Sequence, residues 1–289
     1  MKIASIDIFY RVCMQKVKRA CFLFSVLAIS IVFVIPYLWM IVSAFKAREN
    51  IFADLSPISY KLFIPYRPTL SNFLKLLEET IFPLALVNSL GIAVITIIFS
   101  LVLCSMISFA ISRLEFPGRN VLFVLIISTM LIPFEMVMVP MFLLVQKLKL
   151  DDTYPSIFLP WISDPFIIFL LRQHFLEIPQ ALQDAAIIDG CSYTNIFFRI
   201  MLPNIKPALI SAALIKFIFS WDAYVWPLVV IRDKTKTVIT VAIAKLFTDQ
   251  DILWELIFAG AFLATIPILV LFFFLQRYYV EGIVTTGIK

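Results

Sequence analysis

The sequence predicts an all-α fold, a polytopic membrane protein built from six membrane-spanning helices. Of its 289 residues, 62% are hydrophobic and only 15% are charged, whereas about a quarter of the residues in a typical soluble domain are charged. The apolar residues form long uncharged runs, and about 20 such residues suffice for a helix to cross the hydrocarbon of a bilayer. These runs show no alternation of period two, which excludes a membrane β-barrel. A soluble enzyme and a disordered chain are excluded by the same composition.

The first span is expected at about residues 20–45, a run without any charge. It is too long for the core of a signal peptide and lacks an Ala-x-Ala-like exit, so we expect a retained anchor. A mixed-charge loop, residues 46–79, follows it and completes an N-terminal segment over 1–79. The residues just before the span form a basic cluster: Arg11, Lys16, Lys18 and Arg19.

Five further spans are expected in a core over residues 80–280, followed by a short tail, 281–289. Their approximate ranges are 84–112, 120–145, 153–174, 207–231 and 254–277. Six spans place both termini on one side of the membrane. Lys and Arg divide almost evenly between the two sides, so the basic cluster before the first span decides the orientation, with both termini in the cytoplasm.

The cytoplasmic loop 177–205, between the fourth and fifth spans, is polar yet patterned like two short helices. Pro179 suits a first helical turn, and Gly190 suits a helix end in the left-handed conformation. Ser192 can cap the second helix, which Pro203 is expected to stop. Spacing alone fits two interpretations equally well, an ordinary amphipathic helix at the membrane surface or a docking element for another protein.

The residues of this loop follow a longer pattern. It reads Asp184-Ala185-Ala186, two residues, Asp189-Gly190, nine residues, Ile200, one residue, Leu202-Pro203. This resembles the EAA motif of ABC-transporter permeases, with Asp184 in place of the usual Glu.

The resemblance covers about residues 80–289 and is closest to carbohydrate-type permeases, which are maltose-permease-like or glycerol-3-phosphate-permease-like. Asn88-Ser89-Leu90 opens the second span as it does in those proteins, and residues 221–228 resemble their fifth-helix tryptophan region. The closing signature of that family is degraded here to residues 286–289.

The resemblance implies a type I ABC importer permease, one half of a translocation pathway for a sugar, an oligosaccharide or glycerol-3-phosphate. It implies a bacterial inner-membrane location and coupling to a separate ATPase through Asp184, Ala185, Ala186, Asp189, Gly190, Ile200, Leu202 and Pro203. The implied partners are a second homologous permease, two ATP-binding subunits, an external solute-binding protein and the lipid bilayer, with no nucleic acid. The chain carries no Walker A sequence, so we expect no bound cofactor and no catalysis of its own, with ATP used by a partner subunit.

Charged and aromatic residues inside the predicted spans are candidates for the translocation pathway. Charges are costly in lipid and usually face a cavity or a partner, and aromatic rings with polar tips are of the kind that line sugar pathways. The candidates are Glu135, Lys216, Trp221, Asp222 and Tyr224. For Trp221, a place in an interfacial aromatic belt is an equally good interpretation.

Two other classes of function stay open at this point. An ion-coupled secondary transporter would use the intramembrane charges, but no internal repeat is visible and the loop motif would be unexplained. A membrane enzyme would need a convergent catalytic set, and the chain has one His, no G-x-S-x-G and no metal-ligand spacing, so no metal site is expected.

Overall fold

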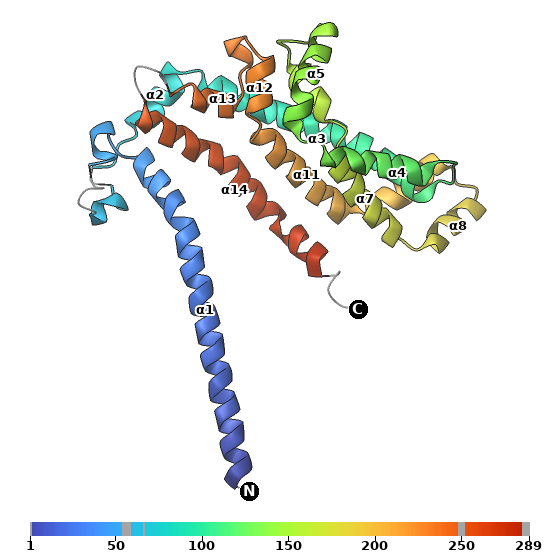
Figure 1. Cartoon of the computed structure of the whole chain (residues 1–289), viewed down its shortest axis with the longest axis horizontal. Helices are drawn as coiled ribbons and strands as arrows, with labels where there is room; N and C mark the ends of the chain where they lie inside the picture. Colours follow the sequence, from blue (N-terminus) through green and yellow to red (C-terminus); the bar gives the residue numbers. More distant parts are fainter. Residues whose placement is uncertain (1, 54–58, 66, 248–251, 285–289) are drawn as a thin grey trace. The chain divides into compact units, whose positions relative to one another are not determined.

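The computed structural model describes residues 2–53, 59–65, 67–247 and 252–284, and these are predominantly helical (Figure 1). No strand occurs within the described ranges, so the predicted all-α fold is confirmed. The longer helices are α1 (Lys2–Ala44), α2 (Ser71–Glu79), α3 (Phe82–Arg113), α4 (Arg119–Ser128), α5 (Phe134–Lys147), α7 (Pro165–Glu177), α8 (Gln180–Ile188), α11 (Lys206–Trp221) and α14 (Trp254–Val284).

Short helices and turns join the longer ones. The α-helical pieces are α6 (Tyr154–Phe158), α9 (Tyr193–Ile196), α10 (Leu202–Asn204), α12 (Val225–Val230) and α13 (Ile239–Ala244). The remaining turns are η1 (Arg48–Asn50), η2 (Tyr60–Leu62), η3 (Thr129–Leu131), η4 (Leu159–Trp161), η6 (Lys234–Lys236) and the π-helical η5 (Phe197–Met201). The expected tail 281–289 begins inside α14, and its last five residues lie outside the described ranges.

The described chain contains three single helices and three bent helix pairs that are candidates for membrane spans by length and composition. Lys18–Ala44, Phe82–Arg113 and Trp254–Phe274 are each long and apolar enough to cross a membrane. The pairs that pass the same test together are Arg119–Leu131 with Phe134–Lys147 (bent by 104°), Tyr154–Trp161 with Pro165–Glu177 (44°), and Tyr193–Asn204 with Lys206–Trp221 (78°). If each bent pair is one span, the count reaches the predicted six.

Prolines account for the breaks, because proline has no backbone N–H to continue a helix. Pro133 precedes α5, and Pro165 occupies the first turn of α7. The start of α7 is capped as a new helix: Asp164 Oδ1 accepts hydrogen bonds from the backbone N–H groups of Phe166 (2.9 Å) and Ile167 (3.3 Å).

The segment predicted as one span over 207–231 is divided in the structure. Helix α11 ends at Trp221, and α12 begins only at Val225. Pro227 lies in the first turn of α12, where its missing N–H costs nothing. In a continuous helix the same proline would remove an internal hydrogen bond and clash with the preceding turn. Residues 222–224 therefore belong to neither helix, and they line the pocket described below.

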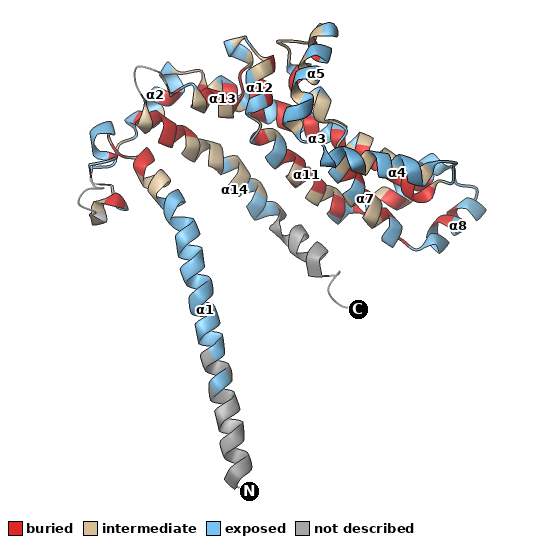
Figure 2. Ribbon diagram, viewed as in Figure 1, coloured by how far each residue is buried: buried red, intermediate tan, exposed pale blue. Residues whose placement is uncertain are grey.

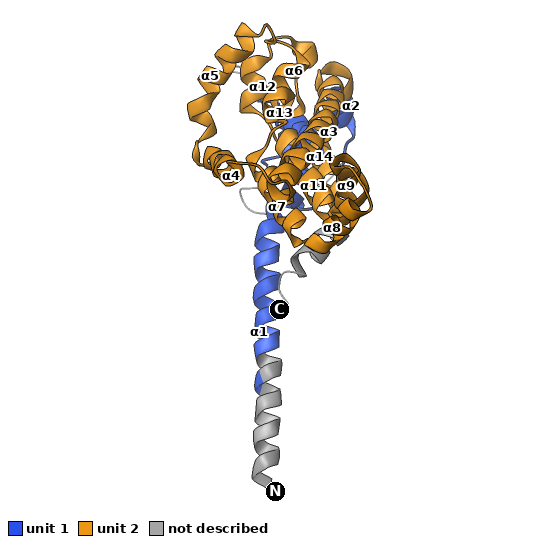
Figure 3. Ribbon diagram, turned by 90° about the vertical axis from the view of Figure 1, so that its right-hand side faces the viewer, with its two compact units in different colours: residues 1–76, 250–262 blue, residues 77–249, 263–289 orange. Residues whose placement is uncertain are grey.

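The chain forms two compact units, shown in different colours in Figure 3. The smaller comprises Met1–Leu76 and Gln250–Phe262. Inside it, Asn72 Nδ2 donates hydrogen bonds to the carbonyl oxygens of Ala44 (2.9 Å) and Lys46 (2.8 Å), and the rings of Trp39 and Phe258 meet edge to face with centroids 5.2 Å apart.

The larger unit, Leu77–Asp249 with Leu263–Lys289, is built around α3. One face of α3 carries small polar residues that are buried: Ser89, Ser100, Ser105, Ser108 and Ser112. Small side chains let membrane helices approach closely, and the Ser108 hydroxyl donates to the carbonyl oxygen of Ile168 on α7 at 2.9 Å. Figure 2 shows buried residues along α3, whereas much of α1 and α4 is exposed, as expected of apolar surfaces that contact lipid.

Candidate functional site

The loop over residues 177–205 forms the two short helices that the sequence predicts, α8 and α9. Gly190 ends α8 in the left-handed conformation, with φ +79°. Its N–H donates to the carbonyl oxygen of Ile187 (3.0 Å), and the N–H of Cys191 donates to that of Ala186 (2.9 Å). These two hydrogen bonds constitute a Schellman motif, which satisfies carbonyl groups that would otherwise have no partner at the helix end. The predicted glycine elbow is therefore confirmed.

The second half of the loop differs from the prediction at one residue. Ser192 caps α9 as predicted, since its hydroxyl accepts from the N–H of Asn195 at 3.4 Å. The prediction that Pro203 stops this helix is wrong, because helical structure continues through Asn204 and ends at Ile205. The wider π-helical turn η5 comes just before Pro203 and accommodates a residue that cannot donate a backbone hydrogen bond.

The motif residues divide into an outward and an inward set. Asp184, Ala185, Asp189, Gly190 and Pro203 are exposed, whereas Ala186 is buried. Ile200 and Leu202 are partly buried and pack against the core cluster that contains Phe109, Phe175 and Phe197. The outward set leaves a thin, acidic surface on α8 that another protein can approach.

A buried arginine that sequence reasoning missed joins α8 to the membrane helices. Arg113, at the end of α3, donates through Nε to the carbonyl oxygen of Phe175 at 3.0 Å and through Nη1 to Gln180 Oε1 at 2.8 Å. Its Nη2 donates to the carbonyl oxygens of Phe175 and Ile178. The only sequence signal was one basic residue at the end of a long uncharged run, which a flanking topological charge also explains.

An aromatic pocket of about 420 Å³ lies where α5, the η4 turn, α11 and α12 meet. The centroids of the Trp161 and Phe219 rings are 5.1 Å apart, and those of Trp161 and Phe134 are 5.2 Å apart. The residues lining the pocket are Phe134, Trp161, Ile218, Phe219, Asp222, Ala223, Tyr224, Val225 and Trp226. Two of the five candidate pathway residues, Asp222 and Tyr224, are therefore brought together here.

The other three candidates lie elsewhere in the described structure. Glu135 is exposed in the first turn of α5, next to pocket-lining Phe134. Trp221 is buried, stacks on Phe217 and donates through Nε1 to the carbonyl oxygen of Ala264 at 3.0 Å. The third candidate, Lys216, is fully buried on α11.

Lys216, which is fully buried, forms an ion pair with the partly exposed Asp164 behind the pocket wall. Its Nζ lies 3.0 Å from Asp164 Oδ2 and donates to the carbonyl oxygen of Trp161 at 2.9 Å. These bonds hold the break between η4 and α7 against α11. Since the Trp161 ring lines the pocket while its carbonyl binds Lys216, the lysine positions the wall without facing the cavity.

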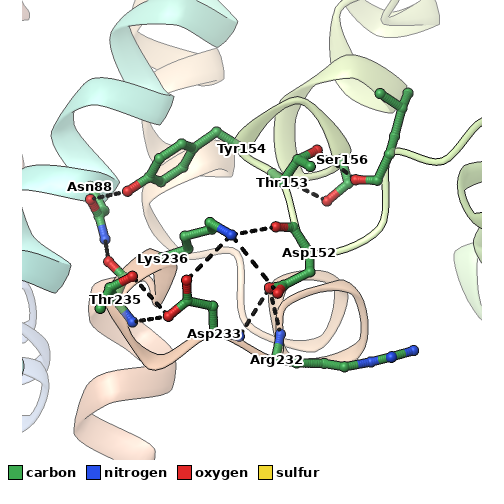
Figure 4. Close-up of polar contacts among 10 residues, drawn as sticks. Asn88, Asp152, Thr153, Tyr154, Ser156, Arg232, Asp233, Thr235 and Lys236 are labelled. Carbon is green, nitrogen blue, oxygen red and sulfur yellow. Dashed lines mark hydrogen bonds and ion pairs between the residues drawn. The ribbon is translucent and has the colours of Figure 1, made fainter.

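Polar contacts also join the loop before α6 to the loop after α12 (Figure 4). Asp152 Oδ1 accepts from the backbone N–H groups of Arg232 (3.0 Å) and Asp233 (2.9 Å), and Lys236 Nζ donates to the carbonyl oxygen of Asp152 at 2.8 Å. The N–H groups of Asp233 and Arg232 lower the pKa of Asp152 from its ordinary value. Sequence reasoning did not find this network, because its residues are about 80 positions apart.

Asn88 extends the network to α3. Its Nδ2 donates to the carbonyl oxygens of Thr235 (2.8 Å) and Thr237 (3.0 Å), and its Oδ1 accepts from the Tyr154 hydroxyl at 3.0 Å. The first residue of the Asn88-Ser89-Leu90 pattern thus connects α3 with both loops. No cluster of His, Cys, Asp or Glu that could hold a metal ion occurs in the described residues.

The fold and the loop together define an α-helical membrane protein with a structured pair of short helices, α8 and α9, between two candidate spans. Residues 102–284 match the family of binding-protein-dependent transport system inner membrane components, and the chain belongs to this family. The family resemblance seen in the sequence is thereby confirmed. The candidate spans of the described residues, up to six if each bent pair is one span, agree with an inner membrane component.

Similar proteins extend over nearly the whole chain. The arabinooligosaccharides transport system permease protein AraQ of Halalkalibacterium halodurans is 35% identical over 262 residues, covering 90% of this chain and 93% of that protein. The lactose transport system permease protein LacG of Rhizobium radiobacter is 29% identical over 249 residues, covering 86% and 89%. The fold matches a chain of a bacterial ABC transporter involved in the import of the acidic polysaccharide alginate, with a TM-score of 0.79, 22% identity, and coverage of 88% and 94%.

Proposed function

We propose that this chain is the permease subunit of an ATP-binding-cassette importer and forms half of the translocation pathway for a sugar or oligosaccharide. The observation that carries the proposal is the exposed acidic face of α8, ended by the Gly190 elbow, in a member of the binding-protein-dependent transport family. An ion-coupled secondary transporter has no use for such a surface.

The outward residues of α8, Asp184 and Ala185, form the docking face for a separate ATPase. Asp189 and Gly190 shape the elbow, while Ala186, Ile200 and Leu202 hold the two helices on the bundle. ATP-driven closure of the ATPase pair then moves the helices and reorients the pathway. This requires the two states to differ in contact free energy with the ATPase, since equal contact in both shifts no population.

The aromatic pocket is the part of this chain that meets the solute. Flat rings such as Trp161 and Phe219 bind the apolar faces of a sugar, and the Tyr224 hydroxyl and Asp222 carboxylate supply hydrogen-bonding groups. No Lys or Arg is among the described residues that line it. The pocket therefore favours a neutral sugar over glycerol-3-phosphate, whose phosphate Asp222 would repel.

Membrane placement and partners follow from the same proposal. The chain lies in a bacterial inner membrane with both termini and α8 in the cytoplasm, which puts the Asp152–Lys236 network outside. A second permease supplies the other half of the pathway, two ATP-binding subunits hydrolyse ATP, and an external binding protein delivers the solute. This chain itself binds no cofactor and catalyses no reaction.

The proposal is tested by a pull-down in mild detergent with the full chain as bait and Gly190→Asp as the control. We expect an ATPase and a second polytopic permease with the unaltered chain, and loss of the ATPase with the variant. The recovered complex is then placed in proteoliposomes with its binding protein and assayed with radiolabelled arabinotriose, lactose and glycerol-3-phosphate. Uptake by this chain alone, driven by an ion gradient without ATP, would establish the secondary transporter instead.

A further inference from the structure

The inference concerns Arg113, whose guanidinium is buried at the cytoplasmic end of α3 with 8% of the residue exposed. A buried charge is costly unless it is paired or fully hydrogen-bonded. Its hydrogen-bond acceptors in the described structure are all neutral oxygens, on Phe175, Ile178 and Gln180. Arg113 therefore differs from a flanking arginine that only extends to water or lipid headgroups.

Two of the acceptors are carbonyl groups at the C-terminal end of α7, and the carbonyl oxygen of Phe175 also accepts from the N–H of Ile178 at 3.3 Å. Phe175 lies in the last turn of α7 and Ile178 just follows it, and the last carbonyl groups of a helix have no N–H partner within it. A cation at this end is also favoured by the helix dipole. Arg113 thus acts as a cap for α7, although it belongs to α3.

Two glutamines continue the connection into α8. Gln180 Oε1 accepts from Arg113, and Gln180 Nε2 donates to Asp184 Oδ1 at 3.1 Å. Gln183, which is buried, donates through Nε2 to the carbonyl oxygen of Arg113 at 3.3 Å. The exposed carboxylate of Asp184 is consequently only two hydrogen bonds away from membrane helix α3.

We propose that Arg113 is the positioning residue that makes α3, the end of α7 and α8 move as one body, so that displacement of α8 by an ATPase reaches the membrane spans. This inference rests on the proposed function. It assigns the transmission of the movement of α8 to Arg113, a residue outside the loop motif. Arginine suits this task because its planar fork of donors engages three acceptors at once, which a lysine ammonium cannot match in geometry.

Arg119 provides a matched control on the same side of the membrane. It is partly exposed, and its Nη1 donates at 3.2 Å to the carbonyl oxygen of Leu114, within the same turn region. In the described part of the chain, its side chain makes no hydrogen bond to α7 or α8. Arg119→Gln removes an equal charge and leaves the Arg113 connection intact.

The experiment measures solute uptake and ATP hydrolysis in the same proteoliposomes, using the complete importer and whichever of arabinotriose and lactose the unaltered complex transports. We expect Arg113→Gln to lower the number of solute molecules imported per ATP about tenfold, with the ATPase still bound, and Arg113→Lys to lower it less. Gln180→Leu removes the side chain that joins Arg113 to Asp184 but spares the bonds of Arg113 to Phe175 and Ile178, so it should lower the ratio about threefold. Arg119→Gln should leave the ratio within about twofold.

A merely structural role would give a different pattern, in which uptake and ATP hydrolysis fall together and their ratio stays constant. That result, or an unchanged ratio in Arg113→Gln, would overturn the inference. If Arg113→Gln fails to reach the membrane, Gln180→Leu decides, because Gln180 is exposed and its replacement spares the fold. Failure of the unaltered importer to show ATP-dependent uptake would instead overturn the proposed function, and this inference with it.

Discussion

Among the described residues of the larger unit, two cations are buried, Arg113 and Lys216, and they are held in different ways. Lys216 lies deep in the bundle and pairs with a carboxylate, Asp164, at 3.0 Å. Arg113 lies at the C-terminal end of α3, and its hydrogen bonds go to neutral oxygens at helix ends. The first arrangement neutralises the charge and fixes a broken helix, whereas the second joins three helices. A buried cation in a membrane bundle is therefore better interpreted from its partner than from its depth.

The largest expected effect comes from breaking the deep pair. Lys216→Met leaves the partly exposed Asp164 carboxylate without its cation and should destabilise the protein by about 2 kcal/mol, the loss of a hydrogen bond between charged groups. The double variant Lys216→Met with Asp164→Asn should recover most of this loss, because the asparagine keeps a capping oxygen without the charge. Thermal unfolding in detergent measures both, and a single variant as stable as the unaltered chain would show that the pair is unimportant.

A second, smaller effect is expected at the Gly190 elbow. A Cβ at this position would meet no atom within 4 Å, so only the left-handed backbone limits substitution. Gly190→Ala should therefore cost about 1 kcal/mol and Gly190→Asn less, because asparagine tolerates this conformation better. We expect ATPase recovery in the pull-down to follow the order Gly, Asn, Ala, with membrane insertion unchanged in all three. Equal recovery from all three chains would contradict a role for the elbow in docking.

A smaller effect is expected on sugar uptake when the lining of the pocket is changed. Tyr224→Phe removes one hydroxyl from the lining, which should raise the KM for sugar uptake about threefold with little change in maximal rate, the effect of losing one hydrogen bond. Trp221→Phe is the control, because Trp221 is buried behind the wall and absent from the residues lining the cavity. A larger change in KM for Trp221→Phe than for Tyr224→Phe would mean that the pathway runs elsewhere.

The smallest effect should be seen at low pH in the network that joins Asp152 to Arg232, Asp233 and Lys236. Since backbone N–H groups lower the pKa of Asp152 in the folded chain, its contribution to stability is present above the ordinary aspartate pKa of about 3.9 and is lost as the pH falls through the lowered value. Hydrogen exchange at Arg232 and Asp233, corrected for intrinsic rates, should be slow at pH 6 and accelerate as the pH drops below about 4. Asp152→Asn should exchange faster at both pH values, while Asp151→Asn should behave as the unaltered chain; protection independent of pH would contradict this assignment.

Sequence reasoning predicted the features that local chemistry determines. The apolar runs specify the spans, and Gly190 and Ser192 specify the ends of the loop helices through their own backbone and side-chain preferences. It failed at Pro203 and at the division after Trp221, where the neighbouring backbone adapts to a proline by widening or breaking the helix.

The partners of Lys216 and Arg113 could not be predicted from the sequence for another reason. Lys216 contacts a residue 52 positions away, and Arg113 contacts one 62 positions away. No periodicity or motif encodes such a pairing, which arises only when the helices pack. Lys216 consequently resembled a pathway residue, and Arg113 resembled an ordinary flanking charge.

The most direct test of the central claim is photo-crosslinking from the exposed face of α8 in native membranes. A photoreactive residue replaces Ala185, and the same residue replaces Val94, an exposed apolar position on α3, as the control. We predict an adduct between the Ala185 position and an ATPase subunit, and none from Val94. Sugar uptake by the Ala185-substituted chain without any ATPase adduct would contradict the account.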